Sequence, residues 1–234
     1  MRLKLIVRDE LNMRKGKISA QLSHAVLGMF LSLAKKENNI YKFNKKNSDL
    51  LEKWLKEPEI EIVKVKNEYE LLNYPEKAKI IRDAGLTEFG EPTYTCSCVY
   101  PDGSEISEES KNIFYPETEL KQVLIANQEL SLDKYTLPKY TTIACVKALE
   151  SYITRVEGEI ILTANEELQT WLSGRFKKIT LKATSNEIKE LIRILDIEKI
   201  KYSIIYFDKE IASIGIEPKK EEEINKITGK LKLY

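Results

Sequence analysis

The sequence predicts an α/β protein built of two similar domains, and three observations support this fold class. Segments of strand character alternate with segments of helical periodicity from residue 3 onward. The second half repeats the order and character of the first at a spacing of about 118 residues, the size of a duplicated domain. The 234 residues, 42% of them hydrophobic, can form one large or two small cores. We therefore expect two three-layer α/β/α domains, each with a mixed four-stranded sheet and helices on both faces.

The N-terminal segment predicts a strand, a basic turn and a helix. An apolar run at 3–7 is followed by a turn that contains Gly16, and helical periodicity continues to about residue 33. On this helix Lys17, Gln21 and His24 fall at i, i+4 and i+7, and therefore on one face, beside an apolar stripe. The polar face of an amphipathic helix normally faces water, so this pattern alone is no functional signal.

The rest of the first half predicts the remaining elements of one domain. Residues 35–48 are rich in Lys and Asn and predict an exposed connection. Asn67 caps a short helix that Pro75 prevents from extending. The expected elements after the connection are a helix at 49–56, a strand at 60–66, a helix at 68–72, a segment at 79–82 that leads into a loop, and a strand at 94–100.

Two groups of motifs in the first half occur together in one known family. The first group is Arg8-Asp9, Gly16-Lys17, Ala20-Gln21 and His24-Ala25; the second is the loop Asp83-Ala84-Gly85-Leu86-Thr87-Glu88. In this order they resemble the type II peptidyl-tRNA hydrolases, and the resemblance covers residues 1 to about 101. The chain departs from that family in the helix before Pro75, which is shorter than the family's.

The second half resembles the same family in its tail but not in its site. Residues 214–218 and 224–231 are similar to the family's Ile-Gly-Pro and Ile-Asp-Lys-Val-Thr-Gly-x-Leu ending. At an offset of 119 residues, the positions of Arg8, Asp9, Lys17, Gln21 and His24 are occupied by Asn127, Gln128, Thr136, Tyr140 and Ile143. We therefore expect a site-bearing domain at 1–117, a catalytically dead copy at 118–234, and a short helix plus linker before residue 117.

The resemblance implies hydrolysis of the ester that joins a peptide to the 3′ ribose of tRNA. It implies Lys17, His24, Asp83 and Thr87 as catalytic residues and Arg8, Gln21 and Thr93 as substrate-binding residues. An ester needs no metal when a water is oriented and deprotonated and the developing oxyanion meets a donor or a cation. Asp83 or His24 is the base, Lys17 the electrostatic stabiliser, and Gln21 or Thr87 positions the water or the carbonyl.

Each candidate also has a purely structural interpretation. His24 can be a satisfied core histidine, and Asp83 can bind only the amides of its own turn. Thr93 and Thr95 can be ordinary strand residues, and Lys17 can simply be solvated. Two function classes therefore remain: an active hydrolase, and a non-enzymatic tRNA-binding or regulatory protein on the hydrolase fold. Retention of the full polar set in one copy favours the enzyme.

The charge pattern favours tRNA as the partner of the first half. The whole chain has a net charge of +1, but residues 1–60 contain 13 Lys or Arg against 7 Asp or Glu. A polyanion is attracted to such a surplus, so we expect the first half to bind tRNA and the second half to contribute little. Because type II hydrolases are homodimers of a domain of this size, we expect an intramolecular pseudo-dimer in a monomeric chain.

Cysteine and histidine usage predicts no metal, no cofactor and no disulfide framework. Cys96, Cys98 and Cys145 lack Cys-x-x-Cys spacing, and a single histidine cannot complete a zinc site with them. No apolar run approaches the roughly 20 residues that span a bilayer, and no cleavable hydrophobic leader is recognisable. We expect a cytoplasmic protein with no membrane partner.

Overall fold

The computed structural model describes residues 1–86, 88–107 and 117–234. The first half forms a mixed four-stranded sheet in the order β4-β1-β6-β5, with β1 and β4 parallel and the other pairs antiparallel. Its elements are β1 (Arg2–Arg8), a 3-10 turn (Asp9–Leu11), α1 (Lys15–Ser32), β2 (Ala34–Glu37), β3 (Ile40–Phe43), α2 (Lys45–Lys56), β4 (Glu59–Val65), α3 (Glu68–Leu72), β5 (Ala78–Asp83) and β6 (Thr93–Val99).

Alternation along β1 places helices on both faces of this first sheet, as predicted. Leu3, Leu5 and Val7 are buried in the core that contains the apolar side chains of α1 and α2. Ile6 points to the opposite face and packs with Leu71 of α3. Helix α3 is short, as the sequence predicts, so the core on its side is smaller than the core under α1.

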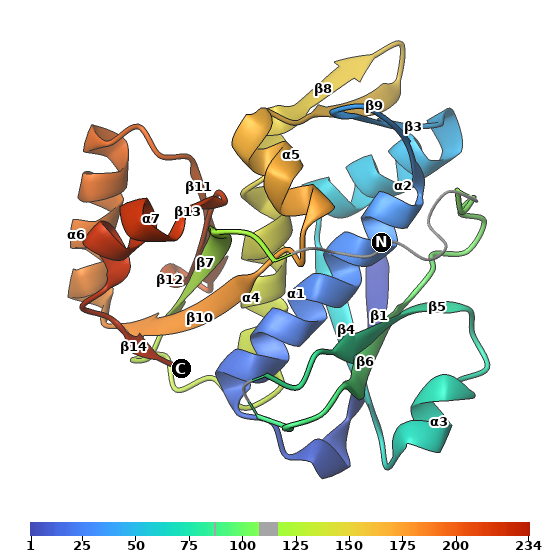
Figure 1. Cartoon of the computed structure of the whole chain (residues 1–234), viewed down its shortest axis with the longest axis horizontal. Helices are drawn as coiled ribbons and strands as arrows, with labels where there is room; N and C mark the ends of the chain where they lie inside the picture. Colours follow the sequence, from blue (N-terminus) through green and yellow to red (C-terminus); the bar gives the residue numbers. More distant parts are fainter. Residues whose placement is uncertain (87, 108–116) are drawn as a thin grey trace.

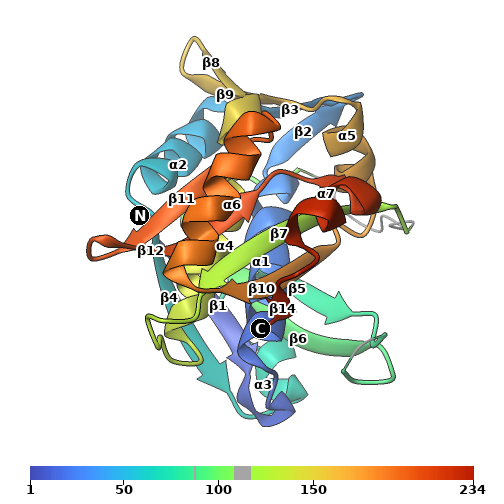
Figure 2. The same cartoon turned by 90° about the vertical axis from the view of Figure 1, so that its left-hand side faces the viewer.

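The second half repeats this sheet in the order β11-β12-β7-β10 with the same strand directions. Two strands of two residues extend it: β14 beside β10, and β13 beside β7. Figure 2 shows α6 and α7 on the outer face of this sheet. The elements are β7 (Leu120–Asn127), α4 (Thr136–Lys147), a 3-10 turn (Glu150–Tyr152), β8 (Ile153–Val156), β9 (Glu159–Thr163), α5 (Glu166–Ser173), β10 (Lys178–Ala183), α6 (Ser185–Ile197), β11 (Tyr202–Phe207), β12 (Glu210–Ile216), β13 (Lys219–Lys220), α7 (Glu221–Thr228) and β14 (Lys232–Leu233).

A third sheet joins the two halves and corrects the prediction for residues 35–48. This segment contains the β2–β3 hairpin and the start of α2, and is not only an exposed connection. Strand β3 pairs with β9 of the second half, which gives the order β2-β3-β9-β8. Tyr41 and Phe43 face inward while the lysines between and beside them face solvent. The alternation of buried and exposed residues that marks a strand is therefore hard to recognise in a segment so rich in Lys.

Helices α1 and α4 pack against each other between the two main sheets (Figure 1). Ser23 of α1 donates a hydrogen bond to Thr142 of α4, its equivalent at the 119-residue offset, with 3.4 Å between the hydroxyl oxygens. Lys42 of β3 stands opposite Ile161 of β9, which is separated from it by the same offset. Equivalent residues of the two halves thus meet each other at both places.

One hydrophobic core continues across the two halves. It contains Trp54 of α2 and Trp171 of α5, both fully buried, together with apolar residues of α1 and β9. Each indole N–H donates to a backbone carbonyl a few residues further on, at 3.2 Å for Trp54 and 3.1 Å for Trp171. The tryptophan pair thus repeats in structure as well as in sequence.

Within the described ranges, no helix combines the length and the apolar character needed to cross a membrane. The predicted helix and linker before residue 117 fall largely on 108–116, outside the described residues, and the boundary between residues 117 and 118 stays a prediction.

Candidate active site

The start of α1 presents the predicted polar face to a cavity. Lys17, Gln21 and His24 all line it, one helical turn after another. Gly16, which the sequence predicts in a turn before the helix, lies within the first turn of α1. Glycine is needed there, because a Cβ at that position would lie 2.5 Å from the carbonyl oxygen of Tyr234. The C-terminal segment of the second half therefore packs directly on the first turn of α1.

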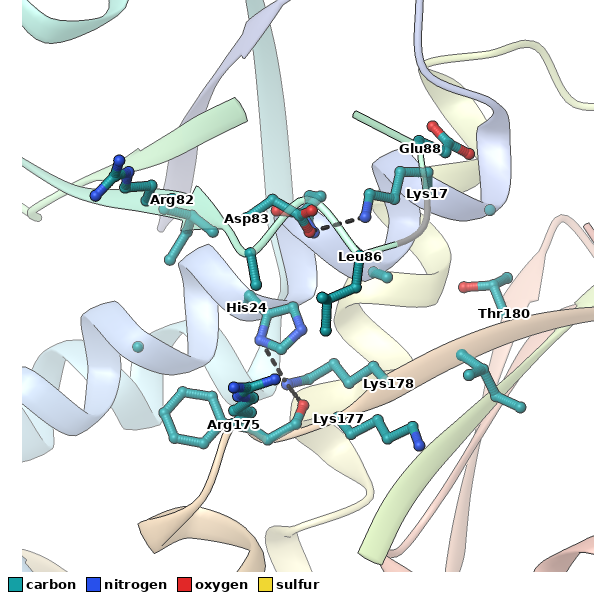
Figure 3. A pocket seen from close by; sticks show the side chains of 18 of the residues that line it. Lys17, His24, Arg82, Asp83, Leu86, Glu88, Arg175, Lys177, Lys178 and Thr180 are labelled. Carbon is teal, nitrogen blue, oxygen red and sulfur yellow. Dashed lines mark hydrogen bonds and ion pairs between the residues drawn. The ribbon is translucent and has the colours of Figure 1, made fainter. Parts of the chain in front are cut away.

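Asp83 at the end of β5 joins this face and forms the centre of a hydrogen-bond network (Figure 3). Its Oδ2 accepts from Lys17 Nζ at 2.7 Å and from Gln21 Nε2 at 2.6 Å. Its Oδ1 accepts from the backbone N–H of Gly85 at 2.9 Å. Lys17 and Asp83 are each only 13% exposed, so their ion pair is shielded from bulk water.

The loop after Asp83 depends on Gly85. This residue has φ +80°, and a Cβ here would lie 2.1 Å from the carbonyl oxygen of Glu91. Only glycine combines that backbone angle with so close an approach. Glu88 of the same loop accepts from Arg14 Nε at 2.7 Å, which ties the loop to the residue that precedes α1.

Thr95 also belongs to this network, although its sequence pattern predicts only an ordinary strand residue. Its hydroxyl, fully buried on β6, donates to Gln21 Oε1 at 2.7 Å. The bond fixes the orientation of the Gln21 amide so that its nitrogen faces Asp83. The available signal was a hydroxyl within a run of buried residues on a central strand, where polar groups need a partner.

The other predicted site residues lie elsewhere or outside the described residues. Arg8 does not line the cavity: its guanidinium pairs with Glu10 and Glu68 and donates to the carbonyl oxygen of Tyr94 at 2.7 Å. The Thr93 hydroxyl donates to the carbonyl oxygen of Glu91 at 2.9 Å and lies outside the cavity lining. Thr87 falls outside the described residues.

His24 is half-buried and meets the second half of the chain. Its Nδ1 lies 3.4 Å from Lys178 Nζ, and its ring stacks on Phe176 with 6.0 Å between centroids. Burial, reinforced by the charges of Lys178 and Lys17, holds the pKa of His24 well below its usual value. The ring is therefore neutral at pH 7. An ammonium group only donates hydrogen bonds, so beside protonated Lys178 the Nδ1 atom accepts and Nε2 carries the proton.

The cavity has a volume of about 890 Å³ and lies between the two halves. The first half contributes α1 and β5, and the second contributes the segment from Arg175 to Thr180 and the C-terminal residues (Figure 3). Its charged lining is Arg14, Lys17, Lys79, Arg82, Arg175, Lys177 and Lys178 against Asp83, Glu88 and Glu117. Cations thus outnumber carboxylates around a concave surface, which suits an anionic ligand.

The equivalent face of the second half has no such network. Ile143, at the position of His24, is buried in the shared hydrophobic core. Tyr140, at the position of Gln21, packs edge-on against Phe207 with 5.6 Å between ring centroids. Thr136, at the position of Lys17, bonds Asp133 of its own helix start. These three side chains pack in the protein or cap a helix, whereas their equivalents in the first half line a cavity.

Comparison with known proteins identifies the family. The family model for peptidyl-tRNA hydrolase PTH2 matches residues 1–111 and again residues 120–234. A Methanopyrus kandleri protein named peptidyl-tRNA hydrolase is 36% identical over 109 residues, which are 43% of this chain and 84% of that protein. Proteins of the same name are 35% identical over 114 residues in Sulfolobus acidocaldarius, covering 45% of this chain and 91% of that protein, and 37% identical over 111 residues in Sulfurisphaera tokodaii, covering 44% and 86%.

The two family matches confirm both the resemblance found in the sequence and the tandem duplication. Each relative is matched over most of its length by less than half of this chain. The chain belongs to the peptidyl-tRNA hydrolase PTH2 family and carries two copies of its domain.

Proposed function

We propose that this protein hydrolyses the ester bond of peptidyl-tRNA at a single site in its first copy. The observation that carries the proposal is the buried network of Lys17, Asp83, Gln21 and Thr95 facing the cavity. The second copy has apolar or aromatic groups at the positions of Gln21 and His24. We infer that it has lost catalysis.

The groups of the first copy suit ester hydrolysis by a water molecule. Asp83 Oδ1 accepts one hydrogen bond from the protein and has a second lone pair for the attacking water. Asp83 is the base: it takes a proton as the water oxygen bonds to the carbonyl carbon. His24 is a poor base in this arrangement, because its Nδ1 accepts from Lys178 and its Nε2 carries a proton.

Lys17 supplies the positive charge that the transition state needs. Its ammonium group lies 2.7 Å from Asp83, so it stands beside the carbonyl oxygen that becomes negative during attack. Collapse of the tetrahedral intermediate breaks the bond to the 3′ oxygen of the ribose. That oxygen receives the proton that Asp83 took, and the carboxylate is restored. Gln21, held by Thr95, keeps Asp83 oriented throughout.

We propose that the reaction needs no metal ion. Among the described residues, no group of three His, Cys, Asp or Glu side chains is placed to hold one. The Asp83 oxygens already accept from Lys17, Gln21 and Gly85. We therefore expect the rate of hydrolysis to be the same in excess EDTA as in buffer. Loss of activity in EDTA that added zinc restores would contradict the metal-free mechanism.

We also propose that the two copies act as a pseudo-dimer within one chain. The contacts of Ser23 with Thr142 and of Lys42 with Ile161 support this proposal, because equivalent residues meet on the axis of an isologous dimer. The shared core and the shared sheet mean that each copy covers apolar surface of the other.

The second candidate function is a tRNA-binding or regulatory protein without catalysis. The cationic cavity alone would satisfy that function. A binder, however, has no need to bury an aspartate against its own lysine and glutamine, since this places a carboxylate where an anionic ligand arrives. The enzyme is therefore the better account of the site.

The test is release of an N-acetylated amino acid from tRNA by the full-length chain. We expect Asp83→Asn and Lys17→Met each to lower kcat/KM at least about tenfold, the usual scale for an acid-base or electrostatic group. The matched control is Asp208→Asn, which changes the aspartate at the corresponding turn of the second copy, where φ +53° also suits asparagine. Its rate should equal that of the unchanged protein. Unaltered rates in both first-copy variants would refute the assignment.

A further inference from the structure

Lys178 of the second copy enters the cavity at the site of the first. It stands at the start of β10 and is only 7% exposed. Its Nζ donates to the carbonyl oxygen of Phe176 at 3.0 Å and lies 3.4 Å from His24 Nδ1. The same atom lies over two ring faces, 4.6 Å from the centroid of Trp171 and 5.2 Å from that of Phe176. Figure 3 shows the side chain extending from β10 toward His24.

All of these partners are uncharged. In the part of the chain that the structure describes, no carboxylate pairs with Lys178. Two other cations of the cavity lining do have such partners: Arg14 pairs with Glu88 at 2.7 Å, and Arg175 with Glu117 at 3.9 Å. Burial of an ammonium group without a counter-charge is unfavourable. A lysine kept under these conditions on the wall of a cavity indicates that an anion comes from outside the protein.

The internal repeat gives a comparison within the same molecule. Strand pairing identifies the equivalent of Lys178. Lys178 stands opposite Gln122 of β7, and Leu3 of β1, which corresponds to Gln122, stands opposite Ile60 of β4. Lys178 therefore corresponds to Ile60, and His24 corresponds to Ile143, both of which are buried in the core. The counterparts of the Lys178–His24 pair are thus two isoleucines. Only the side of the molecule that holds Asp83 carries this cation.

We propose that Lys178 is a substrate-binding residue that holds a backbone phosphate at the 3′ end of tRNA, so that the active cavity is built from both copies. The proposal deepens the proposed function and rests on it. A phosphodiester is the permanent anion nearest to the ester of a peptidyl-tRNA, and lysine binds phosphate as a point charge. The second copy then contributes to RNA binding, contrary to the expectation from the excess of Lys and Arg in residues 1–60.

The test compares two substrates of the full-length protein and its Lys178→Met variant. One substrate is N-acetyl-aminoacyl-tRNA, and the other is the same N-acetyl-aminoacyl ester of adenosine, which has no phosphate. Methionine keeps the length and the packing of the lysine stem without its charge. We expect KM for the tRNA substrate to rise about tenfold with kcat nearly unchanged, as for loss of one charge-assisted hydrogen bond. With the adenosine ester, kcat/KM should not change.

The matched control is Lys182→Met, which removes one charge from the same strand outside the cavity lining. It should leave both substrates unaffected. A fall in kcat of Lys178→Met on both substrates would overturn the proposal in favour of an oxyanion or positioning role. An unchanged KM for the tRNA substrate would overturn it as well.

A thermal unfolding measurement separates binding from a structural role. We expect the Tm of Lys178→Met to equal or exceed that of the unchanged protein, because the variant no longer buries an unpaired ammonium group. A large fall in Tm would mean that the lysine is structural. If the unchanged protein hydrolyses neither substrate, the proposed function fails. The affinity of the protein for deacylated tRNA then still tests whether Lys178 binds a phosphate. A roughly tenfold loss of this affinity in Lys178→Met, with no loss in Lys182→Met, supports the phosphate contact. Equal affinities in the two variants overturn it.

Discussion

The side chains around Asp83 show how much of the proposed site rests on groups that orient other side chains. Thr95 acts only through Gln21, whose amide it orients. Gln21 in turn fixes one oxygen of Asp83, and Gly85 fixes the other. The Asp83 carboxylate is therefore held in one orientation, which keeps its free lone pair directed at one position in the cavity.

Replacement of Thr95 should expose this dependence. In Thr95→Val the buried Gln21 Oε1 loses its donor, so we expect the free energy of unfolding to fall by about 1–3 kcal/mol and kcat by several-fold. Thr95→Ser keeps the hydroxyl and should retain most of the activity. Denaturant titration and steady-state kinetics measure the two effects. A fully active Thr95→Val variant would remove Thr95 from the network.

The pH dependence of substrate binding should report Lys178. Burial lowers the pKa of Lys178 to about 8, so the side chain is charged below that pH and becomes neutral above it. The titratable groups that face it are His24 from α1, which stays neutral, and Cys145 from α4, whose thiol pKa burial raises. We therefore expect KM for the tRNA substrate to rise between about pH 7.5 and 9. In Lys178→Met this rise should be absent, and its persistence there would assign the pH effect to another group.

At the scale of elements, the loop between β5 and β6 depends more on Gly85 than on Gly90. Gly85 and Gly90 both have positive φ, +80° and +73°, but a Cβ at Gly85 meets the backbone of Glu91 whereas a Cβ at Gly90 meets nothing within 4 Å. Gly90→Ala should lower the free energy of unfolding only by the cost of a left-handed backbone conformation at alanine, about 1–2 kcal/mol. Gly85→Ala should also displace the loop that holds Asp83.

We therefore expect Gly85→Ala to lose most of its hydrolysis rate and Gly90→Ala to retain it. The measurement is kcat/KM for N-acetyl-aminoacyl-tRNA beside the Tm of each variant. Equal activities would show that the Gly85 loop does not position Asp83.

The elements that the sequence predicted correctly are those specified by local pattern. The strand at 3–7, the helix that follows the predicted turn and runs to about residue 33, and the short helix that Asn67 caps all follow from periodicity or capping. The β2–β3 hairpin was missed because its stabilising partner, β9, lies in the other half of the chain. When the pairing strand is so distant in the sequence, the only local signal for the strand is the alternation of Tyr41 and Phe43 with polar residues.

The same distinction applies to the site. The residues on α1 and Asp83 were found because motifs mark them, although their contacts come from distant segments. Lys178 lies in a basic and aromatic run from Arg175 to Lys178, in the copy that had lost the family's polar face. No sequence pattern indicates that this run closes the cavity of the other copy, since that depends on how α1 packs against β10.

At the scale of the whole molecule, the two copies contribute different parts of the cavity and of the core. The first copy holds the network around Asp83, and the second supplies one wall of the cavity and part of the common core. The fold of each copy is complete enough to match the family, but among its described residues the first copy has only the five-residue α3 on its outer face.

The first copy should therefore depend on the second for stability. Residues 1–117 expressed alone would expose the face of α1 that packs on α4 and the edge of β3 that pairs with β9. We expect this fragment to aggregate or to lose activity, and the separately expressed residues 118–234 to restore part of it. A soluble, monomeric fragment with the full rate would show that the second copy is no structural partner.

We propose that each chain has one active cavity, formed by the network of the first copy and a wall from the second. The most direct measurement is the calorimetric stoichiometry of a peptidyl-tRNA analogue whose peptide is joined to the 3′ ribose by an uncleavable amide. We expect one analogue bound per chain, with affinity weakened about tenfold in Lys178→Met and unchanged in Lys182→Met. Two analogues per chain, or equal affinities in the two variants, would contradict it.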